Sequence, residues 1–329
     1  MSLVSIVRRS GDSQFVDEGR QLLSDALPVR RQWAARVLGQ FGFQQGRPFG
    51  GRIAPALAAA ARRETDNTTR AEIVGALGSA EDASWVPELL HHAADPHPLV
   101  RIAVAASLPL IFIGEPLNED AVRTLITLSS DVESEVRDWA TMSLGTQSDL
   151  DTPEIREALA ARLGDAGGDT AFEACLGLAR RGDARALERL KERLADPKAP
   201  VFLLDLEAAV ALADPALTPL LERLDDEWSG EDDPHTELLR MALARSAPDA
   251  ASRAADLEET TMAVVERRLA GSGWRVDLVG KYPRSQIRYT GLDGESFTHD
   301  IWHDLAPDGF NPEQQTAQWT FQIPGGMDR

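Results

Sequence analysis

The chain lacks most of the residues and motifs from which catalytic and cofactor sites are commonly built. It has a single cysteine, Cys175, which excludes an internal disulfide bond and a zinc site made of several thiolates. No Gly-Lys-Ser/Thr phosphate loop occurs, and no Gly-x-Gly-x-x-Gly motif follows a predicted strand. We therefore expect no enzyme activity and no bound cofactor. Because its neighbours are apolar, we expect Cys175 to be a buried packing residue.

Positive charge is also scarce. The 329 residues include 34 Lys and Arg, of which three are Lys, against 53 Asp and Glu, so the formal net charge is −19. Proteins bind nucleic acids and anionic membrane surfaces with clustered Lys and Arg, so we expect neither of these partners. The charge instead favours a protein or peptide partner of positive charge. The shortage of Lys fits a GC-rich genome and a salt-adapted host equally well.

No long hydrophobic run is present. The longest mostly apolar run without charge, residues 102–114, is shorter than the roughly 20 residues that span a bilayer. Arg8 and Arg9 follow a short apolar stretch, whereas a secretory signal has its positive charges first. Hydrophobic residues make up 43% of the chain and charged residues 26%, as in globular domains. We expect a cytoplasmic protein.

What the sequence does contain is a repeated motif. In three copies an Asp is followed by an Arg six positions later, then by Leu and by Gly or Pro at thirteen and fourteen positions; the pairs are Asp25–Arg31, Asp95–Arg101 and Asp131–Arg137. Weaker copies align at positions 70, 169, 205 and 236, so that the spacing is 31 to 39 residues. Near position 70 the acid of the motif is assigned to Asp66. Periods in this range are typical of stacked helix pairs.

The residues around the motif favour helices. Residues 134–144 place Val136, Trp139 and Ala140 on one side at helical spacing. Second amphipathic segments lie between the motif copies, at residues 53–63, 85–93, 121–128, 155–163, 186–194 and 217–224. The motif glycines are expected to end helices; they are Gly39, Gly78, Gly145 and Gly177.

The run Asp-Pro-His-Pro-Leu-Val-Arg-Ile-Ala-Val-Ala-Ala-Ser-Leu at 95–108 resembles the second helix of HEAT repeats, in the bacterial form also found in phycobilin-lyase-type proteins. The resemblance covers residues 12–250 and implies an all-α superhelical solenoid of about seven helix pairs over residues 1–252. It implies little about activity. HEAT arrays serve as adaptors, transport receptors, lyase chaperones and, in a few cases, DNA-repair enzymes.

The resemblance also suggests a role for the repeated charges. In HEAT arrays they form a ladder of charge-assisted hydrogen bonds between neighbouring repeats, which here would join Asp25, Arg31, Asp95, Arg101, Asp131 and Arg137. The alternative is a row of Arg side chains that grips an acidic ligand. Trp33 and Trp139 share one register position, and we expect both in the core.

The region after residue 252 differs from the repeats. Residues 257–270 have helical periodicity, and alternating apolar residues predict strands at 274–279, 285–290, 296–305 and 318–323. Residues 253–329 are therefore predicted to form a small α+β unit with an antiparallel sheet. This unit either caps the array or serves as a separate recognition module.

One weak metal candidate lies in this region. His299 and His303 are four residues apart, so they share a face in either a helix or a strand. No Glu adjoins His299 as it would in a zincin motif. An exposed polar face is therefore the preferred interpretation, and we expect no metal.

Two functions are compatible with the sequence. The first is a non-enzymatic scaffold that binds a protein or peptide on the solenoid surface, for example at Gln32, Arg36 and Asp138. Trp228, in the acidic segment 222–233, lies either in a solvated loop or in a docking patch for a basic partner. The second function is a HEAT-like enzyme or lyase subunit that resembles bilin lyases or DNA glycosylases. The acidic charge and the missing motifs disfavour this second function.

Overall fold

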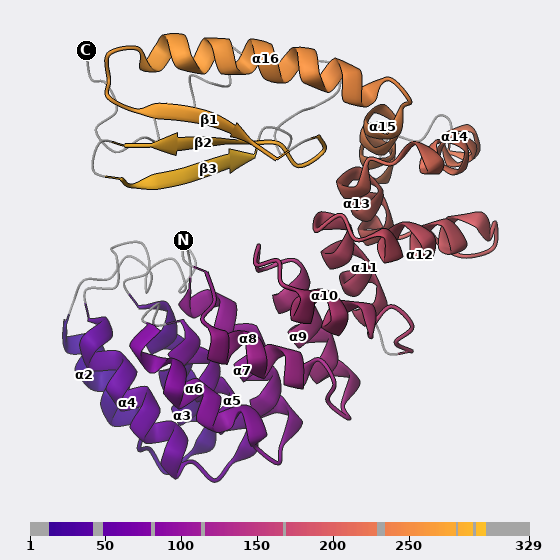
Figure 1. Cartoon of the computed structure of the whole chain (residues 1–329). Coiled ribbons are helices and arrows are strands. Elements are labelled where there is room, and N and C mark those ends of the chain that lie inside the picture. Colours follow the sequence, from indigo (N-terminus) through magenta and orange to yellow (C-terminus); the bar gives the residue numbers. More distant parts are fainter. Residues whose placement is uncertain are drawn as a thin grey trace. The chain divides into compact units, whose positions relative to one another are not determined.

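The structure is a computed structural model that describes residues 13–41, 49–79, 83–112, 116–166, 169–228, 234–280, 282–291 and 294–300. The chain divides into two compact units, Met1–Arg185 and Ala186–Arg329 (Figure 1). The domain boundary predicted at residue 252 therefore falls inside the second unit, close to the start of its longest helix.

The first unit is a row of helix pairs. The first helices of the pairs are α2 (Ser13–Leu22), α4 (Gly50–Arg63), α6 (Val86–His91), α8 (Glu119–Leu128) and α10 (Pro153–Ala160). The second helices are α3 (Pro28–Gln40), α5 (Asn67–Gly78), α7 (Pro98–Ile111), α9 (Ser134–Gly145) and α11 (Thr170–Arg180). Two short 3₁₀ turns flank α6, at Ala83–Trp85 and His92–Ala94.

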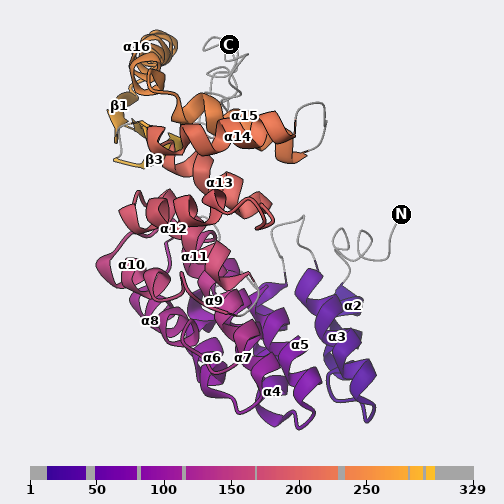
Figure 2. The ribbon, with the colours of Figure 1, turned by 90° about the vertical axis from the view of Figure 1, so that its right-hand side faces the viewer.

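The second helices stack side by side and form one layer. Helix α5 packs between α3 and α7, and α9 packs between α7 and α11 (Figure 2). The first helices form the other layer, with α4 against α5, α8 against α9 and α10 against α11. This arrangement confirms the predicted solenoid of helix pairs.

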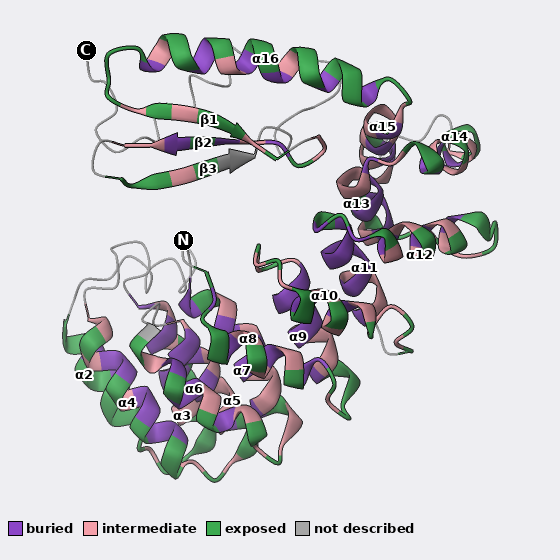
Figure 3. Ribbon diagram, viewed as in Figure 1, coloured by how far each residue is buried: buried purple, intermediate pink, exposed green. Residues whose placement is uncertain are grey.

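The helical periodicity of the sequence explains this layering. Val100, Val104 and Leu108 recur every four residues in α7 and are fully buried, and the equivalent positions of α9 are buried as well. Buried and exposed residues accordingly alternate around each helix (Figure 3). Each buried Val or Leu contributes roughly 1.5–3 kcal/mol of hydrophobic stabilisation.

The motif glycines lie at or near the ends of their helices, as the sequence suggested, but not as left-handed caps. Gly78 and Gly145 are the last residues of α5 and α9, Gly39 is next to last in α3, and Gly177 lies within α11. None of them has the positive φ of a left-handed helix cap. A Cβ built on Gly78 would lie 2.2 Å from the Cβ of Ser107 in α7. Their lack of a side chain instead allows neighbouring second helices to approach closely.

The second unit contains further helices and a three-stranded sheet. Its helices are α12 (Ala184–Ala195), α13 (Leu203–Leu212), α14 (Thr218–Glu227), α15 (Pro234–Ser246) and α16 (Ala250–Leu269), with a 3₁₀ turn at Pro215–Leu217. Its strands are β1 (Arg275–Val279), β2 (Gln286–Thr290) and β3 (Ser296–Asp300), all antiparallel in the order β1-β2-β3.

The sheet packs against α16 to form a small core of its own. Ile287 and Tyr289 of β2 are fully buried against Val265 and Leu269 of α16. Val276, Tyr289 and Phe297 are cross-strand partners on the face that α16 covers. The predicted α+β unit is therefore present, although its helix begins at Ala250 rather than at 257. The predicted strand 318–323 lies outside the described residues.

Candidate functional site

Each of the first four repeats of the first unit contributes one arginine to a ladder, and Arg101 shows its geometry. The Nε and Nη2 atoms of Arg101 donate to Asp131 Oδ2 and Oδ1 of the next repeat at 2.7 and 2.8 Å. Its Nη1 donates to the main-chain oxygen of Asp95, six residues earlier, at 2.8 Å. The six-residue spacing of the motif therefore allows Nη1 of the arginine to bond the turn of its own repeat. Its Nε and Nη2 atoms bond the carboxylate of the next repeat.

The same arrangement recurs along the unit. The bidentate pairs are Arg31–Glu64, Arg70–Asp95, Arg101–Asp131 and Arg137–Asp165. Burial alone would raise the pKa of Asp131, but the Arg101 guanidinium and the backbone N–H of Glu133 hold it below its usual value. The ladder arginines thus donate to the neighbouring repeat and to their own turn.

The ladder includes residues that the sequence motif did not predict. Glu64, Arg70 and Asp165 belong to it but were not assigned, and Asp66 caps α5 through Thr69 instead. Asp25, in the first repeat, pairs with Arg30 and accepts from the backbone N–H of Leu27, so it joins no neighbouring repeat. The signal for Glu64 was available, because it stands six residues before Arg70.

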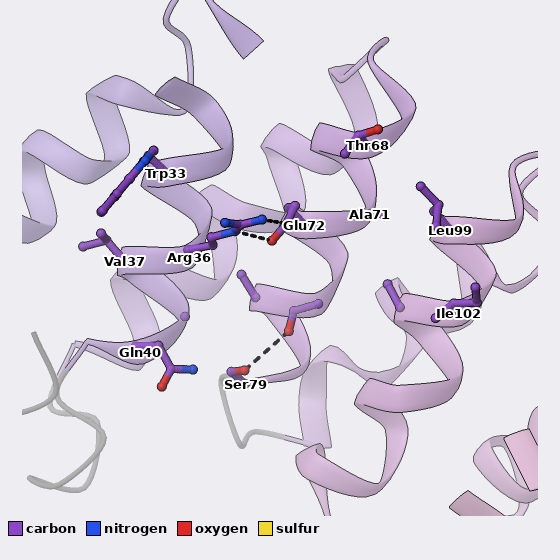
Figure 4. A pocket seen from close by; sticks show the side chains of 14 residues that line it. Trp33, Arg36, Val37, Gln40, Thr68, Ala71, Glu72, Ser79, Leu99 and Ile102 are labelled. Atoms are coloured by element: carbon purple, nitrogen blue, oxygen red, sulfur yellow. Dashed lines mark hydrogen bonds and ion pairs between the residues drawn. The ribbon is translucent and has the colours of Figure 1, made fainter. Parts of the chain in front are cut away.

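A groove of about 780 Å³ lies on the layer of second helices (Figure 4). Trp33 and Val37 of α3 lie along one side, and Leu99 and Ile102 of α7 lie along the other. Helix α5 runs between them and supplies small residues at the floor, which are Thr68, Ala71, Gly75, Ala76 and Ser79. The groove is therefore mainly apolar and is formed by three successive repeats.

Trp33 corrects one expectation from the sequence. Its side chain is 53% exposed, so the prediction that it belongs to the core was wrong. Trp33 is two residues after the ladder arginine Arg31, at a position of α3 that points away from the layer of first helices. Its side chain therefore lies along the groove. Trp139, at the same position of α9, is half-buried.

Two charged side chains of the groove, Arg36 and Glu72, are paired with each other. The Nε atom of Arg36 donates to Glu72 Oε2 at 2.9 Å in a bidentate pair (Figure 4). Gln32 donates from Nε2 to Thr69 Oγ1 at 3.1 Å. Of the two, Arg36 lines the groove, whereas Gln32 connects α3 to α5 beside it.

Acidic groups continue the layer beyond α7. Asp138 of α9 is half-buried and accepts a hydrogen bond from Thr170 Oγ1 at 3.3 Å. Burial raises the pKa of Asp138 above its usual value, and the negative charges of Asp169, Glu135 and Asp165 raise it further. Because Asp165 is paired with Arg137, the uncompensated charge belongs to the other three carboxyl groups.

The remaining predicted residues lie elsewhere. Trp228 is the C-cap residue that follows α14 in the second unit, and its ring meets His235 edge to face at 6.2 Å. Residues 229–233 are not among those described. His299 lies in β3, whereas His303 is outside the described residues. Within the ranges that the structure covers, no three His, Cys, Asp or Glu side chains gather as metal ligands would.

None of the helices in the described part of the chain has the length and the apolar character needed to cross a membrane. Cys175 is buried in α11, as its apolar neighbours predicted.

Comparisons with known proteins identify the repeats. The HEAT repeat family model matches residues 54–145 and 122–213. No curated protein matches the chain. Among solved structures, YibA of Escherichia coli is 24% identical, with 74% of this chain and 84% of YibA covered and a TM-score of 0.57.

Two other structures are more distantly similar. The complex of CpcE and CpcF of phycocyanin lyase from Nostoc sp. is 20% identical, covers 74% of this chain and 93% of that chain, and has a TM-score of 0.39. Human deoxyhypusine hydroxylase in complex with glycerol is 20% identical, covers 78% and 88%, and has a TM-score of 0.30. Only the similarity to YibA, of these three, is close enough to show a common fold. Residues 54–213 of the chain are HEAT repeats.

Proposed function

We propose that this protein is a non-enzymatic scaffold that binds a protein or peptide in the groove formed by α3, α5 and α7. The observation that carries the proposal is the exposure of Trp33 beside a concave apolar surface. Trp is strongly enriched among the residues that dominate binding energy at protein interfaces. Exposed apolar surfaces of this kind mark interaction sites in soluble proteins.

The charges support a partner of positive charge. The chain carries a net charge of −19, and Glu135, Asp138 and Asp169 add local negative charge beside the groove. Such a field speeds the approach of a cationic partner and disfavours an anionic one.

The enzymatic alternatives have weaker support. A DNA-glycosylase-like function would need a basic groove, whereas the cation among the groove-lining residues, Arg36, is paired with Glu72. A lyase-like function rests on the resemblance of the repeats alone. Neither alternative has a residue cluster in its favour among the described parts of the chain.

Site-specific photo-crosslinking in the native host tests the proposal. A photoreactive phenylalanine analogue replaces Gln40, which lines the groove, or Ala59, which is exposed on α4. We expect a reproducible protein adduct from position 40, no such adduct from position 59, and loss of the adduct when Trp33→Ala is added. Equal adducts from both positions, or none from position 40, would contradict the proposal.

A further inference from the structure

We propose that the groove between α3 and α7 binds an amphipathic, cationic α-helix of the partner, with its apolar side against α5 and its Lys or Arg side chains toward α9. This inference rests on the proposed function and specifies the chemistry and conformation of the partner. It follows from the width of the groove, from the bare floor at Gly75 and from the position of the carboxyl groups.

The width of the groove suits a helix. Helix α5 separates α3 from α7. The axes of packed helices lie roughly 8–10 Å apart, so the axes of α3 and α7 are separated by roughly twice that distance. A helix with its side chains is about 10–12 Å across, whereas an extended strand is considerably narrower. A helix can therefore contact Trp33 on one side and Leu99 on the other while resting on α5.

The floor of the groove is kept low at Gly75. A Cβ added to Gly75 would meet nothing within 4 Å, in contrast to Gly78, where it would collide with Ser107. Glycine inside a helix lowers helix stability relative to alanine, so an unneeded glycine is a cost to the fold. No contact within the described structure requires Gly75 to lack a side chain. A partner helix that lies on α5 would require it, because a side chain at this position would fill the space that the helix occupies.

The carboxyl groups define the charged side of the partner. Glu135 and Asp138 occupy, in α9, the positions that Leu99 and Ile102 occupy in α7, so the acidic groups directly continue one side of the groove. Asp138 is half-buried and close to other negative charges. A Lys or Arg of the partner helix would compensate these charges, and this complementarity selects a cationic helix over an anionic one.

Three fluorescent peptides of about 18 residues test the inference with the full chain. The first has Leu and Lys in a helical 3.6-residue pattern, the second has the same composition in strict alternation, and the third replaces Lys with Glu in the helical pattern. We expect fluorescence anisotropy to show that the first peptide binds at least about tenfold more tightly than either of the others. Equal binding of the first and second peptides would show that a helix is not selected.

Substitutions of two glycines locate the binding. Gly75→Leu fills the floor of the groove, and Gly51→Leu, at an equally open position of α4, is the matched control. We expect Gly75→Leu to weaken binding of the Leu/Lys helix at least about tenfold and Gly51→Leu to leave it unchanged. Circular dichroism should show both variants folded, because neither added side chain meets a neighbour at its Cβ.

The contradicting results separate this inference from the scaffold proposal. If the helical peptide does not bind, or binds equally well to the Gly75→Leu variant, the inference is wrong. Crosslinking from position 40 would still support a scaffold whose partner is not a helix. If crosslinking from position 40 is also absent, both proposals are wrong. Asp138→Asn, which retains an acceptor for Thr170, should weaken binding of the Leu/Lys helix at low salt but not at high salt.

Discussion

Single arginines join the repeats of the first unit, and each does so with two sets of donors. Arg137 donates from Nε and Nη2 to Asp165 at 2.7 and 2.8 Å and from Nη1 to the main-chain oxygen of Asp131 at 2.9 Å. The Asp165 side chain is 5% exposed, and its other cationic partner, Arg162, makes a single longer contact at 3.4 Å. Removing one member of a buried pair leaves an uncompensated charge, which is far more costly than losing an exposed pair.

The ladder predicts a large loss of stability for one substitution. Arg137→Ala should lower the free energy of unfolding by about 3 kcal/mol, because the buried Asp165 loses its bidentate partner and keeps only the longer contact with Arg162. Arg123→Ala is the control, since Arg123 and Asp120 form an exposed pair, and its effect should stay below about 0.5 kcal/mol. Urea unfolding followed by circular dichroism measures both. Equal effects would contradict the structural role of the ladder.

A buried histidine predicts a dependence of stability on pH. Burial lowers the pKa of His92 below its ordinary value of 6.5, and His91 lowers it further, although Glu88 and Asp95 act in the opposite sense. The unfolded chain therefore binds this proton more readily than the folded one. The stability that neutral His92 provides is present above about pH 6.5 and is lost as the pH falls toward the folded-state pKa.

The expected slope can be measured. The free energy of unfolding should fall by at most about 1.4 kcal/mol per pH unit from this group as the pH drops below 6.5. His92→Gln removes the titrating group, so its stability should change less between roughly pH 7 and roughly pH 5.5. A variant that loses as much stability as the wild type over this interval would show that His92 does not cause the slope.

At the scale of helices, close approach depends on residues without side chains. Helix α5 meets α7 at Gly78 and Ser107, and α9 meets α11 at Gly145 and Gly177, where a Cβ on Gly177 would lie 2.6 Å from the Cα of Gly145. The motif glycine therefore sets the spacing between repeats. That spacing also sets the distance between α3 and α7, which form the two sides of the groove.

This packing predicts contrasting effects of two glycine substitutions in α5. Gly78→Ala should lower the free energy of unfolding by roughly 1–3 kcal/mol, because the added Cβ collides with Ser107. Gly75→Ala should raise it by roughly 0.5–1 kcal/mol, because its Cβ meets nothing and the helix gains stability. Thermal and urea unfolding measure both changes. Adding Ser107→Gly to Gly78→Ala should restore part of the loss, and no recovery would contradict the proposed collision.

The helices and strands were largely predictable, but their exact ends were not. The second helices follow from the Val, Ala and Leu periodicity, as in Val136, Ala140 and Leu144 of α9. The sheet strands follow from alternation, although α16 begins seven residues before the predicted start at 257 because Ala250 and Ala254 also pack against the unit. Local patterns specify the type of element, whereas its ends depend on tertiary contacts.

At the scale of the whole molecule, the net charge of −19 opposes folding by repulsion between like charges. Salt screens exposed charges more strongly than largely buried pairs such as Arg101–Asp131. The Tm should therefore rise when NaCl is increased from about 0.05 M to about 0.5 M. Differential scanning calorimetry measures this shift. A Tm that falls with salt would mean that attractive surface pairs dominate the electrostatic balance.

The sequence by itself determined the repeat, its helical layers, the acidic charge and most of the ladder, because these depend on residue type and on spacing within about 40 positions. Only the tertiary structure decided that Trp33 is exposed and that Glu64, rather than Asp66, accepts the hydrogen bonds of Arg31. It also decided that a Cβ would collide at Gly78 but not at Gly75. A second helix packs against its own first helix and against two neighbouring second helices. Its apolar periodicity does not distinguish those contacts from the remaining open face, so the groove becomes visible only when three repeats are stacked.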